Sequence, residues 1–251
     1  MQRQIGTLRT TGLVGLVGLA ALGGCAASGG DESILVLKNV APPTSATTGA
    51  CTFTPAETEA GLLRGVLDTS AHTGSEFTAQ LKSRITADAG QVDVRTILLR
   101  GANVDLAFAD ATLLSADELA SLKSKNLLHF MSLFSAPLGP NGGLTDAPFE
   151  LIPAGVADVL DGKLGTTTTV VQAKFTVVGD LAGGSVSSQA FSYSVTLGHG
   201  ILIDNQGPCA MLKSSAMVRS GNPCFPGQDA ITDCCTSPTG TAVCPAVGTA
   251  M

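Results

Sequence analysis

The chain has no tryptophan, a single tyrosine and only three histidines among its 251 residues. Charged residues make up 14% of it, and lysine and arginine form no basic cluster. Because contacts to phosphate depend on clustered basic side chains, this composition excludes nucleic acid as a partner. The scarcity of tryptophan and tyrosine counts against a sugar-binding cleft, and no phosphate-binding glycine loop is present.

Catalytic motifs are also missing. The segment Gly183–Ser187 (GGSVS) lacks the second glycine of the G-x-S-x-G nucleophile turn. Asp68, Ser70 and His72 bring an acid, a hydroxyl and an imidazole together, but such close neighbours seldom adopt triad geometry. We interpret them as a polar turn, and we expect His129 to be a core or edge residue of a strand. The sequence therefore predicts a non-enzymatic protein. The alternative, a hydrolase that uses Asp68, Ser70 and His72, stays open.

The longest apolar run, residues 12–22, is about half the roughly 20 residues that a membrane-spanning helix needs. It follows Arg3 and Arg9 and ends in the tetrapeptide Leu22, Gly23, Gly24 and Cys25. A positive start, a short apolar run and small residues before a cysteine are typical of a cleaved signal peptide. This N-terminus resembles the signal peptide and lipobox of bacterial lipoproteins.

The resemblance implies that residues 1–24 are removed and that Cys25 carries a diacylglycerol and an N-acyl chain, with no other cofactor. Two or three acyl chains hold a protein durably on a membrane. Ala26 stands where an aspartate would retain a lipoprotein in the inner membrane, so we expect the outer membrane of the cell envelope. Which leaflet it occupies stays open. Residues 25–33 would then form a short flexible tether.

Assigning one of the seven cysteines to the lipid leaves an even number. Outside the reducing cytosol, six cysteines predict three disulfides, with 15 connectivities open. Five of them fall in the last 43 residues, so we expect a stapled, loop-rich tail with little helix or sheet of its own. Neighbouring cysteines should have different partners, because a ring between them is strained. The gaps do not match the paired spacing of zinc sites, so we expect no metal site. The disulfide candidates are Cys51, Cys209, Cys224, Cys234, Cys235 and Cys244.

The remainder of the chain is acidic and rich in strand-forming residues. Without Arg3 and Arg9 it has 12 basic against 20 acidic residues, a formal net charge of −8. Alternating apolar residues and frequent turn formers predict strands, and Ser115 with Glu118 forms a capping box for a helix over 115–125. The predicted strands are 34–40, 65–68, 77–85, 92–99, 104–108, 127–134, 149–152, 167–179, 187–197 and 201–203. We expect a turn-rich loop over 137–148, one helical turn over 155–160, and a hairpin whose long loop is 180–186.

These elements predict a mainly β protein. The fold would be an antiparallel β-sandwich, immunoglobulin-like or related, with one or two short helices and the stapled tail. A partly open barrel is the alternative. The expected organisation is a signal peptide (1–24), a tether (25–33), a sandwich (34–204) and a cysteine-rich tail packed on it (205–251).

The tail segments Cys224–Asp229, Cys234–Cys235 and Cys244–Pro245, with the strand pair 170–179 and 191–197, resemble outer-membrane lipoproteins of uncharacterised function from myxobacteria. This chain has Gly198–Gly200 (GHG) where strands of those proteins often lead into a cysteine pair. The resemblance carries no known activity. We expect a structural or protein-binding lipoprotein with envelope or extracellular proteins as partners. A lipoprotein that captures a small molecule or metal is a further alternative.

Overall fold

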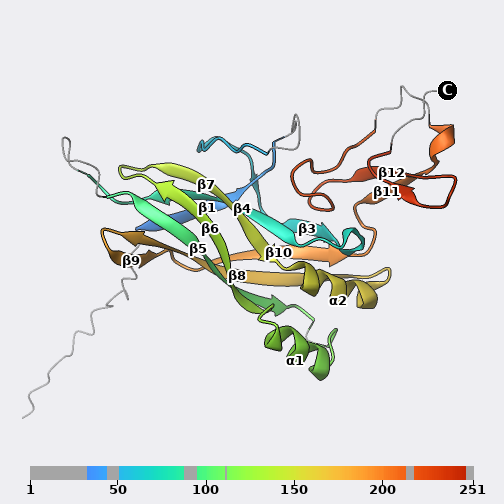
Figure 1. Ribbon diagram of the computed structural model, residues 1–251, viewed down its shortest axis with the longest axis horizontal. Coiled ribbons are helices and arrows are strands. Elements are labelled where there is room, and N and C mark those ends of the chain that lie inside the picture. The colour runs from blue at the N-terminus through green and yellow to red at the C-terminus, as the bar shows by residue number, and fades with distance from the viewer. Residues whose placement is uncertain (1–32, 44–50, 88–94, 111, 213–217, 247–251) are drawn as a thin grey trace, which may run out of the picture.

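Two β-sheets face each other, and a third, smaller sheet lies at one end of them (Figure 1). This computed structural model describes residues 33–43, 51–87, 95–110, 112–212 and 218–246. The predicted signal peptide, the lipobox with Cys25 and most of the tether lie outside the described residues, as do 92–94 of the predicted strand 92–99. No helix within the described ranges is long and apolar enough to cross a membrane.

The first sheet is antiparallel, in the order β2 (Gly61–Leu62), β1 (Ile34–Val40), β4 (Ser75–Ser83) and β7 (Leu144–Ile152). The second has the order β3 (Gly65–Asp68), β10 (Phe191–Gly198), β8 (Thr168–Leu181), β5 (Ile97–Phe108) and β6 (His129–Leu138), and β9 (Gly184–Ser187) also pairs with β8. All its pairs are antiparallel except β3 with β10, which is parallel. The predicted mainly β sandwich is confirmed, with this one parallel pair as an exception.

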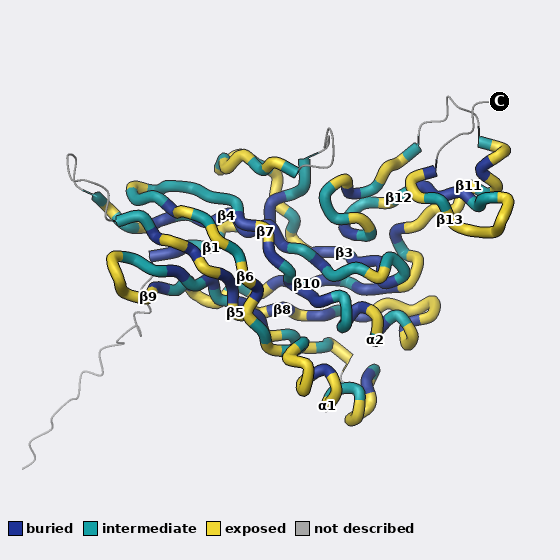
Figure 2. The backbone as a smooth tube through the Cα atoms, viewed as in Figure 1, coloured by how far each residue is buried: buried dark blue, intermediate teal, exposed yellow. Residues whose placement is uncertain are grey.

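Aromatic side chains from both sheets meet in the core. Phe77 on β4 is fully buried, and its ring centroid lies 4.9 Å from those of Phe175 and Tyr193 on the second sheet. The predicted alternation on β8 is confirmed, because its inward residues Val171, Ala173, Phe175 and Val177 are all at most 1% exposed. Figure 2 shows the buried backbone running along the inner strands. Burying such rings dominates the stability of a sandwich core.

Several predicted boundaries are wrong. Residues 97–99 of the strand predicted over 92–99 and the strand predicted over 104–108 belong to one continuous strand, β5, in which the register shifts at a bulge beside Gly101. Glycine is required there because a Cβ would lie 2.4 Å from the Ser132 carbonyl oxygen. The expected loop over 137–148 is mostly strand, because Pro137 and Pro148 sit on β6 and β7, the edge strands of their sheets, where a missing N–H is tolerated. The link 180–186 contains most of β9, which folds back on β8 through a two-residue turn.

The two helices lie on the same side of the molecule (Figure 1). The helix α1 (Ala116–Ser124) begins as predicted, with the capping box of Ser115 and Glu118 in place. The helix α2 (Ala154–Leu164) is longer than the single turn expected over 155–160. Four apolar residues of α2 are buried, namely Val156, Ala157, Leu160 and Leu164. Packing of this face against the sandwich extends the helix beyond its weak local signal.

The tail has more regular structure than expected. Its three-stranded sheet has the order β11 (Ile203–Pro208), β12 (Thr232–Thr236) and β13 (Ala242–Val243). The predicted last strand of the sandwich, 201–203, is therefore wrong: Ile203 begins a strand of the tail sheet. The structure contains the disulfides Cys51–Cys224, Cys209–Cys235 and Cys234–Cys244. The predictions of three disulfides and of separate partners for the adjacent cysteines are confirmed, and the bond of Cys51 ties the tail to the start of the chain.

The tail docks on β3 by strand-like pairing. The Asp68 N–H donates to the Gly227 carbonyl at 2.8 Å, and Asp229 exchanges hydrogen bonds with the backbone of Val66 through its own N–H and its side chain. The side-chain amide of Gln228 accepts from the Glu76 N–H at 2.8 Å and donates to the Glu76 carbonyl at 2.6 Å. These contacts cover the free edge of β3, which would otherwise expose unpaired backbone groups.

Candidate functional site

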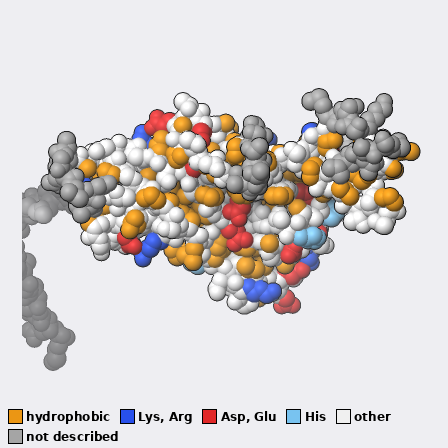
Figure 3. Space-filling model, turned by 45° about the horizontal axis from the view of Figure 1, so that its top comes forward, with side chains coloured by type: hydrophobic (Ala, Val, Ile, Leu, Met, Phe, Trp, Pro, Cys, Tyr) orange, Lys and Arg blue, Asp and Glu red, His pale blue; other side chains and the backbone are white. Residues whose placement is uncertain are grey.

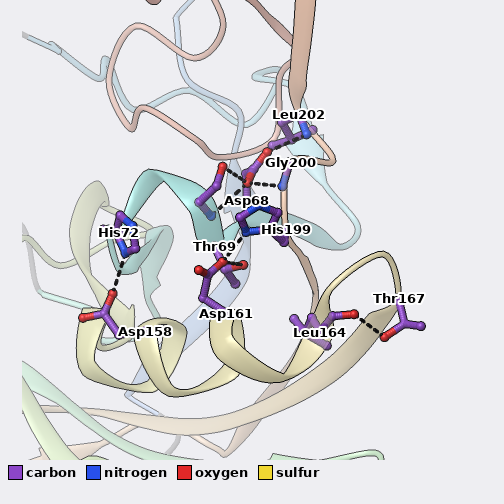
Figure 4. A network of polar contacts seen from close by, with 11 residues as sticks. Asp68, Thr69, His72, Asp158, Asp161, Leu164, Thr167, His199, Gly200 and Leu202 are labelled. Atoms are coloured by element: carbon purple, nitrogen blue, oxygen red, sulfur yellow. Dashed lines mark hydrogen bonds and ion pairs between the residues drawn. The ribbon is translucent and has the colours of Figure 1, made fainter. Parts of the chain in front are cut away.

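The junction of sandwich and tail is organised around a buried carboxylate. Asp68 ends β3, is fully buried, and caps the short helix η2 (Thr69–Ala71). Its Oδ1 accepts from the Ser70 N–H and hydroxyl and from the Gly200 N–H, and its Oδ2 accepts from the Leu202 N–H at 2.8 Å. Four donors satisfy both oxygens, which is the condition for burying such a group. Asp68 thereby fixes the path of the chain from β10 into the tail (Figure 4).

Two histidine–aspartate pairs flank this point. Asp158 and Asp161 are three residues apart on α2 and so lie on one face of the helix. His72 Nδ1 lies 3.0 Å from Asp158, and His199 Nδ1 lies 2.7 Å from Asp161 (Figure 4). The Thr69 hydroxyl also donates to Asp161, at 2.6 Å. In the space-filling view, histidine and acidic side chains gather below the tail (Figure 3).

The pair of His199 and Asp161 is electrostatically coupled. Hydrogen bonds from Thr69 and then His199 hold the pKa of Asp161 below its ordinary value. The same bond to Asp161 raises the pKa of His199. The pair therefore favours the charged forms of both groups and links the end of β10 to α2.

The hydrolase alternative requires Ser70, His72 and Asp68 to form a chain of hydrogen bonds, and the described contacts do not have this arrangement. The Ser70 hydroxyl donates directly to Asp68 at 2.6 Å, while His72 bonds to Asp158 instead. Thr69 and His199 share the oxygen of Asp161, so no hydroxyl bridges to the imidazole there. A catalytic triad requires the nucleophile's hydroxyl to bond to one nitrogen of the imidazole and the carboxylate to bond to the other nitrogen. The structure brings Asp68 and Ser70 together but leaves His72 with a different carboxylate.

A cavity of about 530 Å³ lies beside Asp68, between the sandwich and the tail. The sandwich side contributes Asp68, Ser70 and Leu202, and the tail side is rich in proline and includes Cys234 and Cys244, which are bonded to each other. This volume is within the range of small-molecule sites. Sequence reasoning missed the cavity because residues 68–71 line it together with residues more than 130 positions further along the chain.

Asn222 lines the same cavity and is 3% exposed. Its Oδ1 accepts from the N–H groups of Cys224 and Phe225, at 2.9 and 3.0 Å. Its Nδ2 is buried and has no hydrogen-bond partner among the described residues. Buried polar atoms are seldom left without partners, so this unpaired donor distinguishes Asn222 from the other described residues of the lining.

A second polar cluster covers the outer face of β4. The buried amide of Gln80 donates to the Ala56 carbonyl at 2.9 Å and to Glu59 at 3.1 Å, and Asp146 lies opposite it on β7. Burial, followed by the charge of Glu59, raises the pKa of Asp146 to about 6. These contacts hold the segment before β2 against the first sheet.

The remaining sequence-predicted residues lie away from the junction. His129 is an exposed residue at the start of the edge strand β6 and pairs with Asp105, so of the two expected places it occupies the edge. Gly183–Ser187 forms the turn and strand of the β8–β9 hairpin. Within the described ranges, no group of three or more histidine, cysteine, aspartate or glutamate side chains could hold a metal ion.

No protein-family model matches the chain, and a comparison with curated proteins finds no match either.

Proposed function

We propose that this protein is a non-enzymatic, lipid-anchored protein of the bacterial cell envelope, held in the outer membrane by acyl chains on Cys25. We propose further that it binds other envelope or extracellular proteins with the end that carries the tail. The observation that carries the proposal is the placement of the first strand. Ile34, nine residues after Cys25, begins β1 at the end of the sandwich away from the tail (Figure 1).

The length of strand β10 gives the approximate distance between these two ends. Ser188, just before β10, forms a bridge with Ile34, and Gly198 at the end of β10 pairs with Asp68 at the junction. Eight residues of strand span roughly 25 Å. A tether at Ile34 would therefore place the tail on the side of the domain that faces away from the membrane.

Apolar side chains on the tail support a role in protein binding. Met211 is 80% exposed, and Ile231 and Ile203 are 44% and 38% exposed. Loops held by a rigid scaffold commonly carry recognition, and the disulfides supply that rigidity here. At the junction, His72 and His199 each bond to a carboxylate and the Ser70 hydroxyl bonds to Asp68; these contacts support the non-enzymatic part of the proposal.

Two experiments test the two parts separately. Cys25→Ala should abolish acylation and move the protein from the membrane to the soluble fraction; unchanged membrane retention would refute the anchor. For the binding end, p-benzoylphenylalanine would replace Met211 in intact cells, with the exposed Ser185 on β9 as the matched control. Photocrosslinks to another protein should form at position 211 and not at 185, and the reverse pattern would refute the proposed orientation.

A further inference from the structure

The cavity beside Asp68 is wide enough for a ligand and is built from rigid parts. Its tail side includes Pro223, Pro226, Pro245 and the disulfide Cys234–Cys244. Proline rings and a disulfide lose little conformational freedom when a ligand binds, which favours affinity. The apolar side chain of Leu202 faces them from the sandwich side.

The polar groups of the cavity restrict the chemistry of a ligand. Asp68 is fully buried and its carboxylate already accepts four hydrogen bonds within the protein, so it does not need a cationic partner from a ligand. Among the described residues of the tail and the sandwich, no lysine or arginine lines the cavity, and Arg219 is already paired with Asp204 and Asp233. These features favour an uncharged ligand. The part of the lining that the structure describes contains no aromatic ring to stack on a sugar or a base.

Asn222 supplies one hydrogen-bond donor. Its Oδ1 is held by two backbone N–H groups, so the orientation of the amide is set, and Nδ2 is the atom left without a partner. A carbonyl oxygen is the acceptor that best matches an amide N–H in an apolar surrounding. We propose that this cavity binds a small uncharged molecule with an apolar body and a carbonyl oxygen, which accepts a hydrogen bond from Asn222 Nδ2.

The site goes beyond the proposed function and does not depend on the lipid anchor. It can therefore be tested on the chain from residue 25 onward, carrying Cys25→Ala and with its three disulfides formed. The probe is camphor, a rigid bicyclic ketone, and the readout is NMR titration of the backbone amides and the Asn222 side-chain amide. We expect shifts at Asn222 and at Ser70 and Leu202 on the opposite wall. Absence of shifts at the cavity would overturn the proposal.

The variant Asn222→Asp keeps the oxygen that accepts from Cys224 and Phe225 but removes the donor. It should weaken camphor binding by roughly fivefold or more, because one neutral hydrogen bond is lost and a carboxylate oxygen repels the ketone oxygen. Asn103→Asp, at an exposed position on β5, is the matched control and should leave binding unchanged. Equal affinity of wild type and Asn222→Asp would contradict the role of the amide.

Camphene provides a second measurement that needs no variant. It is a bicyclic hydrocarbon of similar size without a carbonyl group, so the wild-type chain should bind it more weakly than camphor. Equal binding of the two probes would overturn the proposal even if Asn222→Asp failed to fold. Neither result bears on membrane fractionation or on crosslinking at Met211, so failure here is distinguishable from failure of the proposed function.

Discussion

Removing the disulfide Cys51–Cys224 should destabilise the protein more than removing either of the other two. It joins residues 173 apart, whereas Cys209–Cys235 and Cys234–Cys244 join residues 26 and 10 apart. A cross-link limits the freedom of the unfolded chain more when it closes a longer loop. The chain-entropy relation assigns about 5 kcal/mol to the longest loop, and about 3.5 and 2.7 kcal/mol to the others.

The folded state should survive this change. The tail is still held on β3 by the hydrogen bonds of Gly227 and Asp229 with Asp68 and Val66, and by the amide of Gln228. The loss should therefore appear in the free energy of unfolding rather than in the native fold.

The assay is urea denaturation of three double variants, each with one cysteine pair replaced by alanine. Because the chain has no tryptophan, far-ultraviolet circular dichroism is the suitable signal. Before unfolding begins, each variant should have the same circular dichroism baseline as the wild type. The urea midpoint should fall furthest for the variant that loses the longest loop and least for the one that loses the shortest. A smaller loss for Cys51→Ala/Cys224→Ala than for Cys234→Ala/Cys244→Ala would refute the reasoning. That result would mean that the unfolded chain is already constrained or that the tail unfolds separately.

Three other perturbations follow from the same structure. The pKa of His199 is raised above 6.5, so its pair with Asp161 contributes fully to stability below pH 6.5, and this contribution is lost as the pH rises through the raised pKa. Asp161→Asn should lower the pKa of His199 measured by NMR. An unchanged pKa would contradict the pairing. The pKa of Asp146 is about 6 against an ordinary 3.8, so its contribution is present below 3.8 and is lost as the pH rises through 6. Asp146→Asn should raise the free energy of unfolding at neutral pH and should make it less dependent on pH between 3.8 and 6. Chemical denaturation at several pH values measures both effects, and a lower free energy of unfolding at neutral pH would contradict the prediction. Phe77→Ala should cost about 3–5 kcal/mol because the ring is fully buried, whereas Leu63→Ala, at a 98% exposed position, should change stability by less than about 0.5 kcal/mol; similar losses for both would contradict the assignment of the core.

Local patterns predicted the elements whose environment matches their sequence. The alternation on β8 and β10, the strand β1 and the capping box of α1 are all present, because each follows from residues that are neighbours along the chain. Prediction failed where packing outweighed local preference. Pro137 and Pro148 indicate a loop but are accommodated on edge strands, and α2 extends beyond its local signal because the sandwich buries its apolar face.

The candidate site was much less predictable than the fold. Asp68, Ser70 and His72 are close in sequence, yet His72 bonds to Asp158 on α2, and the two N–H donors from the end of β10 reach Asp68 from 132 and 134 residues away. The partner of His199 is 38 residues away. No sequence spacing indicates these pairs, since they depend on the parallel pairing of β3 with β10.

A mainly β domain, an even set of six cysteines once Cys25 is assigned to a lipid, and an acidic composition without basic clusters can all be inferred from the amino-acid sequence. These properties depend on composition, parity and periodicity, all of which are readable along one dimension. The pairing of the cysteines, the docking of the tail and the cavity that Asn222 lines beside Asp68 become visible only in the folded chain. Such features arise from contacts between segments far apart in the chain, and their geometry is set by packing rather than by local preference.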